Sequence, residues 1–379
     1  MAQVLFILAD DFMQLYRARN PKKSPLWQIL NRHFEVFVEI YQEVYEPQIG
    51  SFRPIIPDVV GKFMDCGNLE RGFARIRCDH CQEEHLLAFS CKSRWFCPSC
   101  HQKNVQTSAQ FIAEHVLAPV PHRHYVLAIP KMLRSYFQHH RYLIKDLCRL
   151  AQESLAEYQQ TALEMPDGIP AIIMTVHTFG EYLDFHPHIH ALVADGLFQR
   201  TAPATGKDAL PQIPQLPVFQ PMPEISLKPL EELFRAKIIN HLVKSKLLPP
   251  ERVQVLYSWR HSGFNVHHGQ SAPPEAKADL EGLAQYILRN PFSVEKMTVE
   301  SPTDTIIYRS RLNAKINRNF EVFKPTDFIA AITQHIPDKG VQMVRYYGWY
   351  SNKTRGVRQR GLPPEMVVRK PGISPPPPA

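Results

Sequence analysis

The sequence predicts an α+β fold, in which an N-terminal helical and zinc-ribbon-like part precedes a domain with a central antiparallel sheet flanked by helices. Three observations support this. The chain has 379 residues and 44% hydrophobic content, which is enough for two or three domains that each bury a core. Six of the seven cysteines lie between residues 66 and 100. Short apolar runs typical of strands then alternate with segments of helical periodicity.

The N-terminal third divides into two units. Residues 26–65 carry apolar residues at helical spacing, so we expect a helical segment over residues 1–65. The stretch 66–103 is rich in Cys, His and turn-forming residues, and its regular structure is predicted to be a pair of short ribbons around a metal.

The remainder is predicted as one long domain, 104–300, followed by a basic region, 301–370, and a proline-rich tail, 371–379. The expected elements are a strand at 125–129, one or two helices within 132–163, an antiparallel hairpin formed by 171–179 and 188–194, a helix around 230–242, strands at 252–259 and 263–267, and a helix at 280–288. Six prolines within 199–223 exclude a helix interior or a central strand and predict a long surface loop.

Composition limits the class of partner. A formal net charge of +8 and a pI near 9.0 favour an acidic partner. The longest apolar stretches are far shorter than the roughly 20 residues that span a bilayer, so no membrane partner is expected. No positively charged leader precedes the first apolar stretch, and we therefore expect a cytoplasmic protein.

The cysteine spacing predicts a structural metal. Cys78-x2-Cys81 and Cys97-x2-Cys100 are 15 residues apart, a spacing with which two knuckles close a tetrahedral Zn²⁺ site. Four thiolates leave no open position for catalysis. Nearby side chains leave a replaced ligand or a second metal open: His80, His85, Cys91, His101 and Cys66.

A histidine cluster predicts a second, catalytic metal. His188 and His190 lie two residues apart on an expected strand, so both imidazoles point to one face. A hairpin turn near residue 183 would place His177 opposite His188 as third ligand, while His186 and His267 compete for that role. Three imidazoles leave positions open on an ion that polarises a phosphodiester, and we expect Mg²⁺ or Mn²⁺.

The C-terminal segment predicts contact with nucleic acid. Between Lys339 and Lys370 lie eight Lys or Arg residues and one acid, interleaved with aromatic residues. Cations and aromatics together suit a phosphate backbone with stackable bases, although a solvated basic tail is the alternative. The candidate DNA-binding residues are Arg345, Tyr346, Lys353 and Arg355.

Four short motifs together resemble the HUH transposases of rolling-circle insertion sequences, including the common-region (ISCR) elements. The segments Cys78–Cys81, Ser90–Lys92 and Cys97–Cys100 are similar to their zinc-binding domain. His186–His190 resembles their HUH motif. Gln285–Pro291 resembles the segment that bears their nucleophile, and Val344–Gly348 a motif of their C-terminal part.

The resemblance implies an HUH endonuclease domain that nicks and rejoins single-stranded DNA of the element ends and target through a 5′-phosphotyrosine. It assigns the nucleophile to Tyr286. Arg289, one helical turn onward, is a cation for the phosphate, and Lys296 is a candidate activator of the phenol. Gly282 and Asn290 occupy the positions where some relatives have another tyrosine. A single-tyrosine enzyme would need a second subunit or a reused Tyr286, so an oligomer stays open.

Three alternatives remain at this point. A plasmid replication initiator or relaxase would use the same chemistry, but the N-terminal cysteine block favours the transposase. A non-enzymatic zinc-ribbon protein would bind DNA without cutting it. A metal-dependent hydrolase of small phosphoesters would leave no protein attached to DNA.

Overall fold

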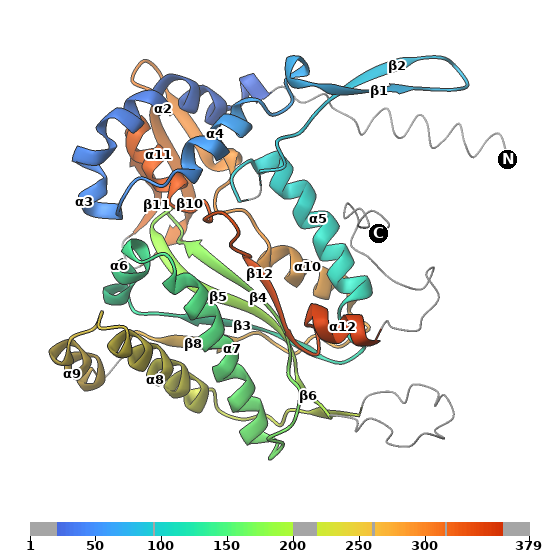
Figure 1. The fold of residues 1–379 in the computed structure, drawn as a ribbon, viewed down its shortest axis with the longest axis vertical. Coiled ribbons are helices and arrows are strands. Elements are labelled where there is room, and N and C mark those ends of the chain that lie inside the picture. The colour runs from blue at the N-terminus through green and yellow to red at the C-terminus, as the bar shows by residue number, and fades with distance from the viewer. Residues whose placement is uncertain (1–20, 94, 200–217, 260–261, 315–316, 359–379) are drawn as a thin grey trace, which may run out of the picture.

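The computed structural model describes residues 21–93, 95–199, 218–259, 262–314 and 317–358 (Figure 1). The first 20 residues, most of the predicted proline-rich loop at 199–223, the end of the basic region and the tail at 371–379 lie outside the described residues. The fold is mixed α and β with antiparallel sheets, which confirms the predicted class.

A five-stranded antiparallel sheet forms the centre of the molecule, in the order β12-β4-β5-β3-β8. Its strands are β3 (His122–Ala128), β4 (Ala171–Phe179), β5 (Phe185–Ala194), β8 (Asn265–His268) and β12 (Val344–Gly348). Every residue of β4 is buried, because helices cover both faces of the sheet. The register breaks between His177 and Phe179, where Pro187 on the neighbouring strand interrupts regular pairing.

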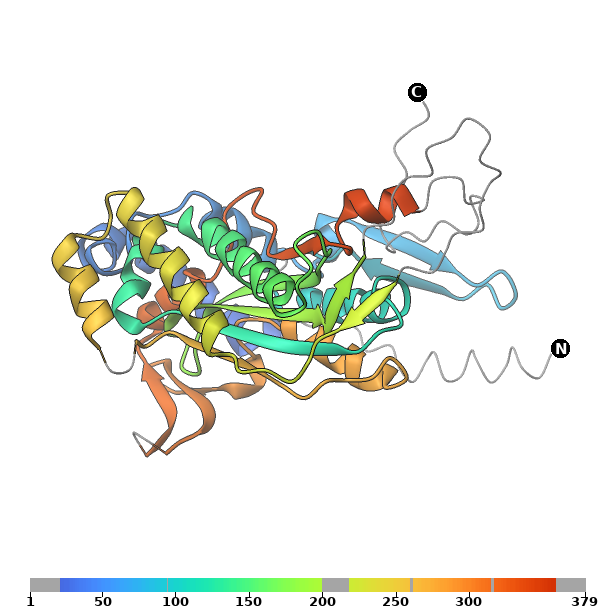
Figure 2. The same cartoon turned by 90° about the horizontal axis from the view of Figure 1, so that it is seen from below.

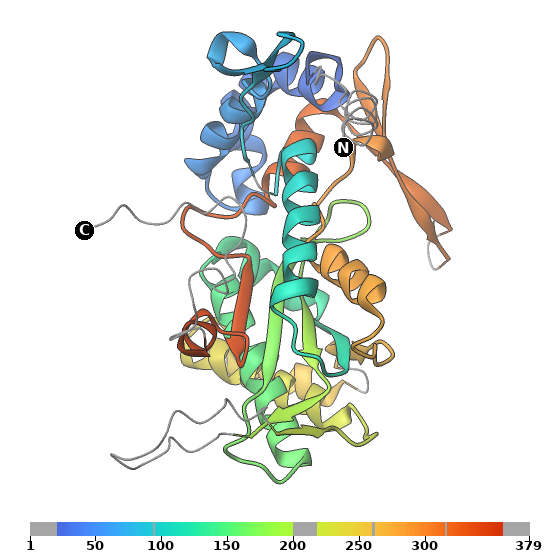
Figure 3. The same ribbon diagram turned by 90° about the vertical axis from the view of Figure 1, so that its right-hand side faces the viewer.

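The two faces of the sheet have different roles. On one face pack α6 (Lys131–His139), α7 (Leu143–Ala162), α8 (Lys228–Lys244) and α9 (Pro250–Ser258), over a core that includes Ile189, Ala191 and Val193. On the other face α5 (Pro98–His115) and α10 (Lys277–Ile287) lie side by side (Figures 1 and 3). Because side chains alternate along β5, His188 and His190 point to the α5 and α10 face.

The predicted strand at 252–259 is wrong, since α9 occupies residues 250–258. Its β-branched and aromatic residues suggested a strand, but Pro250 stands in the first helical turn, where proline is favoured. One apolar side chain, Leu256, is fully buried against the core, and the remainder of the helix is largely exposed.

A second unit combines an N-terminal segment with residues 297–333. It contains α2 (Pro25–Val44), α3 (Glu46–Ile49), α4 (Ile55–Met64), α11 (Pro325–Thr333) and a three-stranded sheet of β9 (Met297–Glu300), β10 (Thr305–Asn313) and β11 (Arg318–Phe323). Their side chains share one hydrophobic core, which also includes Cys66, Cys97 and Cys100. This core includes residues on both sides of the predicted boundaries at 65, 103 and 300.

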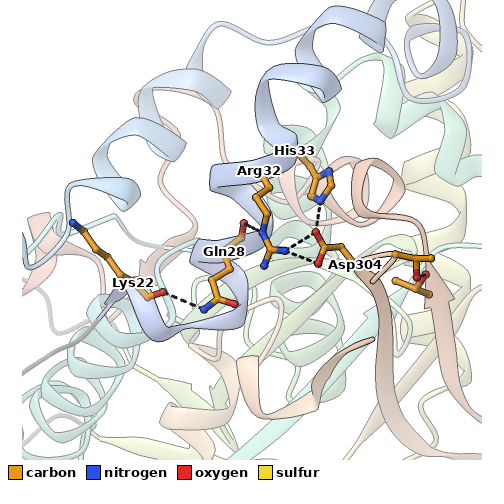
Figure 4. Close-up of polar contacts among 7 residues, drawn as sticks. Lys22, Gln28, Arg32, His33 and Asp304 are labelled. Atoms are coloured by element: carbon orange, nitrogen blue, oxygen red, sulfur yellow. Dashed lines mark hydrogen bonds and ion pairs between the residues drawn. The ribbon is translucent and has the colours of Figure 1, made fainter. Parts of the chain in front are cut away.

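An ion-pair network fixes the turn between β9 and β10 to α2. Asp304 accepts hydrogen bonds from Arg32 at 2.7 and 2.8 Å and lies 2.8 Å from the His33 ring nitrogen (Figure 4). Beyond this anchored turn, the far part of the β10–β11 hairpin projects from the body (Figure 2), and the Tyr182 hydroxyl donates a hydrogen bond to its Arg318 carbonyl.

The remaining elements are short. The predicted pair of ribbons in the cysteine block is one hairpin, of β1 (Phe73–Arg77) and β2 (Glu84–Ala88), which projects from the body (Figure 1). The others are η1 (Pro21–Lys23), η2 (Leu69–Arg71), β6 (Gly196–Phe198), β7 (Phe219–Pro221), η3 (Val294–Lys296) and α12 (Asn352–Arg358). None of the helices in the described ranges combines the length and apolar character needed to cross a membrane.

Candidate active site and zinc centre

Four cysteine sulfurs meet at the start of α5. The Cys66 and Cys91 sulfurs each lie 3.6 Å from that of Cys100, and the Cys97 sulfur lies 3.9 Å from that of Cys66. Four sulfurs placed tetrahedrally at about 2.3 Å from one ion would be about 3.8 Å apart. The spacing of this cluster therefore fits a Zn²⁺ ion.

The sulfur set differs from the predicted one. Cys97 and Cys100 are in the cluster, but Cys78 and Cys81 are exposed in the turn that joins β1 to β2 and lie outside it. The prediction relied on paired spacing, which treats each C-x2-C as a ligating knuckle. Instead Cys66 precedes the β1–β2 hairpin and Cys91 follows it. The hairpin is therefore inserted in the chain between two candidate ligands.

The local sequence explains how Cys97 and Cys100 are positioned. Cys97 is the N-cap of α5 and Pro98 occupies its first position, so the helix begins between the two sulfurs. The four thiols hydrogen-bond to one another, and the net effect lowers the pKa of Cys100 and Cys66 and raises the pKa of Cys91 and Cys97.

Three histidines converge on one face of the five-stranded sheet, the face opposite to α7. His177 and His188 are direct partners in the β4–β5 register, as the hairpin prediction required. Together with His190 they offer nitrogen atoms that all lie within 4.8 Å of one another. The competing residues are outside this group: His186 lines a cleft beside it, and His267 is exposed on β8.

Hydrogen bonds leave one nitrogen of each imidazole free to bind a metal. His177 Nε2 donates to the Ile287 carbonyl at 2.9 Å, and His188 Nδ1 donates to the His186 carbonyl at 2.7 Å. A carbonyl only accepts, so these nitrogens carry the protons and His177 Nδ1 and His188 Nε2 carry lone pairs. His177 Nδ1 and His190 Nε2 are buried without a hydrogen-bond partner among the described residues. Orphaned buried nitrogens of this kind fit a bound cation.

Burial keeps these imidazoles neutral. It is the main cause that lowers the pKa of His188 to about 3, and it also depresses the pKa of His177 and His190. The cationic Arg289 contributes in the same direction to all three. A neutral imidazole is the form that binds metal.

Tyr286 lies against this histidine cluster. Its ring centroid is 5.4 Å from that of His190 and 5.5 Å from that of His124, edge-on in both cases. The side chain is 42% exposed, so it remains accessible from solvent. The structure therefore brings the predicted nucleophile and the predicted metal ligands together.

His124 is a member of the site that the sequence did not reveal. Its Nε2 lies 2.8 Å from His190 Nδ1 and the two rings stack. Burial lowers the pKa of His124 to about 4. It comes from β3, far from the HUH motif in sequence, and only the pairing of β3 with β5 places it there.

The two predicted cations have different surroundings. The guanidinium of Arg289 lies 4.3 Å from the centroid of the Tyr286 ring, and its buried Nε has no hydrogen-bond partner among the described residues. Lys296 is exposed, and its ammonium lies 5.9 Å from the ring of Tyr308 instead. We find Lys296 in no contact with Tyr286 among the described residues, so the expectation that it activates the phenol has no geometric support.

Other tyrosines are placed unlike Tyr286. Tyr308 is buried in the core shared by α2 and α11, and burial raises its pKa to about 12. Tyr257 is exposed on α9 and packs against Arg235, on the far face of the sheet. Neither contacts the histidine cluster.

The predicted DNA-binding residues do not form one surface. Tyr346 packs with α5, and the guanidinium of Arg355 lies 5.3 Å from its ring. Arg345 precedes Tyr346 on β12 and is directed to the other face, near Cys148 of α7. Lys353 is exposed on α12.

Two aromatics of this segment have structural roles. The hydroxyl of Tyr350 is 2.6 Å from His122, and Trp349 stacks on Phe198. These rings are therefore packed within the protein, which the interleaved pattern did not distinguish from a platform for bases.

Two family models match the chain. One described as a putative transposase matches residues 171–358, which include the histidine cluster and Tyr286. One described as a transposase zinc-binding domain matches residues 36–129, which include all six clustered cysteines. No solved structure matches the chain.

Two curated proteins are similar over most of their length. The transposase for insertion sequence element IS801 of Pseudomonas savastanoi pv. phaseolicola is 24% identical over 338 residues, covering 86% of this chain and 78% of that protein. The putative transposase y4qJ of Sinorhizobium fredii (strain NBRC 101917 / NGR234) is 23% identical over 336 residues, covering 83% and 79%. Together the two models and the two relatives identify the chain as an insertion-sequence transposase with an N-terminal transposase zinc-binding domain.

Proposed function

We propose that this transposase nicks and rejoins single-stranded DNA through a 5′-phosphotyrosine at Tyr286, in a rolling-circle-like reaction. The observation that carries the proposal is the contact of the Tyr286 ring with His190 and His124, beside three converging imidazoles. A tyrosine that only packed in a core would not be half-exposed at such a cluster.

The chemistry follows from the side chains present. The phenol oxygen of Tyr286 attacks the scissile phosphorus, an O–P bond to tyrosine forms, and the bond from phosphorus to the 3′ oxygen breaks. The phenol loses its proton, and the departing 3′ oxygen gains one and becomes a hydroxyl. Because the phosphotyrosine bond replaces the broken phosphodiester bond, its energy remains available for rejoining. Arg289, close to the ring, stabilises the negative charge on the phosphate.

His177, His188 and His190 would hold the catalytic Mg²⁺ or Mn²⁺, which when bound polarises the phosphate as a Lewis acid. The carbonyls of Ile287 and His186 orient two of these ligands, and His124 supports the third. Because Ile287 follows Tyr286 directly, the bond from His177 also fixes the end of the nucleophile's helix.

The structural zinc is proposed to bind Cys66, Cys91, Cys97 and Cys100. The near-tetrahedral sulfur spacing supports this set over the two C-x2-C pairs. Because these cysteines lie in the core shared by α2 and α11, the ion would stabilise the fold rather than take part in cleavage.

The decisive experiment incubates the protein and its Tyr286→Phe variant with labelled single-stranded DNA from the element ends and Mn²⁺. The wild type should form a protein–DNA adduct that survives denaturation, and Tyr286→Phe should form none while binding the same DNA. Tyr257→Phe, which changes an exposed tyrosine away from the site, is the matched control. Adduct formation by Tyr286→Phe at the wild-type rate would contradict the assignment.

A further inference from the structure

A cleft opens directly beside the histidine cluster. It has a volume of about 630 Å³ and lies where β3 ends, β8 begins and α6 starts. Ala128 in its lining is the register partner of His188, and the ring of His186, also in the lining, is 4.9 Å from that of His188. Anything bound in the cleft is thus next to the candidate metal ligands.

The cleft has an aromatic wall. Trp259, at the end of α9, lines it and is 43% exposed. Among the described residues no other aromatic ring or cation packs on the indole. Pro130 and Met132 make the lining largely apolar. An exposed indole beside apolar side chains offers a stacking surface for a planar base.

The cleft also has a cationic edge. Lys131 and Arg134, from the first turn of α6, line it. The Arg134 side chain is only 21% exposed, its Nε is buried without a partner among the described residues, and its one ion pair is a 3.3 Å contact to exposed Asp184. A partly desolvated guanidinium with spare donors fits a phosphate oxygen.

We propose that this cleft binds one nucleotide of the DNA strand adjoining the scissile phosphate, with its base on Trp259 and its phosphate at Lys131 and Arg134. The inference rests on the proposed function, since it takes the histidine cluster as the site of cleavage. Because every base has a planar face that can stack on an indole, we expect the cleft to bind the strand without selecting a sequence.

The test measures binding separately from cleavage. In a Tyr286→Phe background, fluorescence anisotropy follows a fluorescein-labelled single-stranded oligothymidylate. Trp259→Ala should weaken binding about 10-fold, in line with the loss of one base stack, and Trp259→Phe should retain most of the affinity. Tyr257→Ala, which removes a similarly exposed ring from the same helix but outside the cleft, should leave affinity unchanged.

The salt dependence of binding tests the role of the two cationic side chains. The double change Lys131→Ala and Arg134→Ala should reduce the salt slope of binding by about 0.7, the contribution of the one phosphate that both side chains contact. Wild-type affinity in Trp259→Ala and a wild-type salt slope in the double variant, with unaltered thermal unfolding, would overturn the proposal. Absence of any adduct in the wild type, with the Trp259→Ala defect present, would reject the cleavage chemistry but keep the nucleotide site.

Discussion

The imidazole Nε2 of His101 donates a hydrogen bond of 2.8 Å to the carbonyl of Leu288. His101 follows Cys100 in α5, and Leu288 lies two residues beyond Tyr286 at the end of α10. His177 donates to the preceding carbonyl, that of Ile287. The helix that carries Tyr286 is therefore held at its end by one residue beside the cysteine cluster and by one candidate ligand of the catalytic ion.

Removal of the His101 imidazole should slow adduct formation more than it weakens DNA binding. His101→Ala leaves the Leu288 carbonyl without its donor, so α10 loses one of two anchors and Tyr286 its fixed position. We expect at least a 10-fold lower rate of adduct formation, because small displacements of a reacting group are costly. Single-turnover kinetics and anisotropy measure the two quantities. His115→Ala, an exposed change on the same helix, should affect neither, and an equal effect of both variants would argue against a positioning role.

Zinc content should separate the two cysteine sets. Cys66→Ser and Cys91→Ser should each lower the zinc bound and the unfolding temperature, whereas Cys78→Ser and Cys81→Ser should alter neither, because the latter sulfurs are exposed outside the cluster. Elemental analysis and thermal unfolding check both. The reverse outcome, with zinc lost only from the Cys78 and Cys81 variants, would restore the spacing-based ligand set.

Metal titration should define the third histidine ligand. Calorimetry with Mn²⁺ on the zinc-replete protein should show one site that His188→Ala abolishes and that His177→Ala weakens at least 10-fold, since His177 Nδ1 has no other partner among the described residues. His267→Ala, on exposed β8, serves as control and should bind as the wild type. Loss of the site in His267→Ala alone would reassign the ligand.

The C-terminal cations should contribute unequally to DNA binding. Lys353 is exposed on α12, so Lys353→Ala should lower the salt slope of single-strand binding by about 0.7. Arg345 is directed to the α7 face, away from Tyr286, and Arg345→Ala should leave the slope unchanged. Equal slopes for both variants and the wild type would mean that this segment makes no phosphate contact.

Stability should fall in mild acid partly because of His335. This imidazole is fully buried, and burial lowers its pKa to about 3, whereas the unfolded chain titrates near 6.5. As pH falls below 6.5, His335 gains a proton in the unfolded state but not in the folded state. Its contribution to the free energy of unfolding is therefore present above that pH and is lost below it. Between pH 7.5 and 5.5 the loss from this group is about 1.4 kcal/mol.

His335→Gln preserves a donor for the Leu183 carbonyl and an acceptor for Thr178 but does not titrate. The pH dependence of its unfolding free energy, from urea denaturation, should be smaller than that of the wild type by that amount. His139→Gln, at an exposed histidine, should retain the wild-type dependence. An unchanged dependence in His335→Gln would show that the pKa of His335 is the same in the folded and unfolded states, which would contradict the effect of burial.

The sequence predicted features that depend on local patterns. Alternation along β5 and a short hairpin were sufficient to place His177 opposite His188, because strand register follows from turn position. The position of Tyr286 came from a resemblance, and the structure adds the contacts with His190.

Features that depend on the tertiary fold could not be predicted in this way. His124 joins the site through pairing of β3 with β5, and Cys66 joins the sulfur cluster across a hairpin, so neither has a local spacing signal. Aromatics such as Tyr350 have the same sequence signature whether they pack inside the protein or stack on bases.

The hydrophobic core that unites α2 and α4 with β10 and α11 has a consequence for synthesis and for the exchange of segments. A ribosome releases α2, α4 and all six clustered cysteines long before residues 306–332 emerge, so the apolar side chains of α2 and α4 lack part of their core until then. An exchange of residues 25–120 with those of a relative would also separate Leu26 and Ile29 from Phe328 and Ile332, with which they share that core. Hybrid proteins joined near residue 120 should therefore be less stable than hybrids that exchange residues 25–120 and 297–333 together.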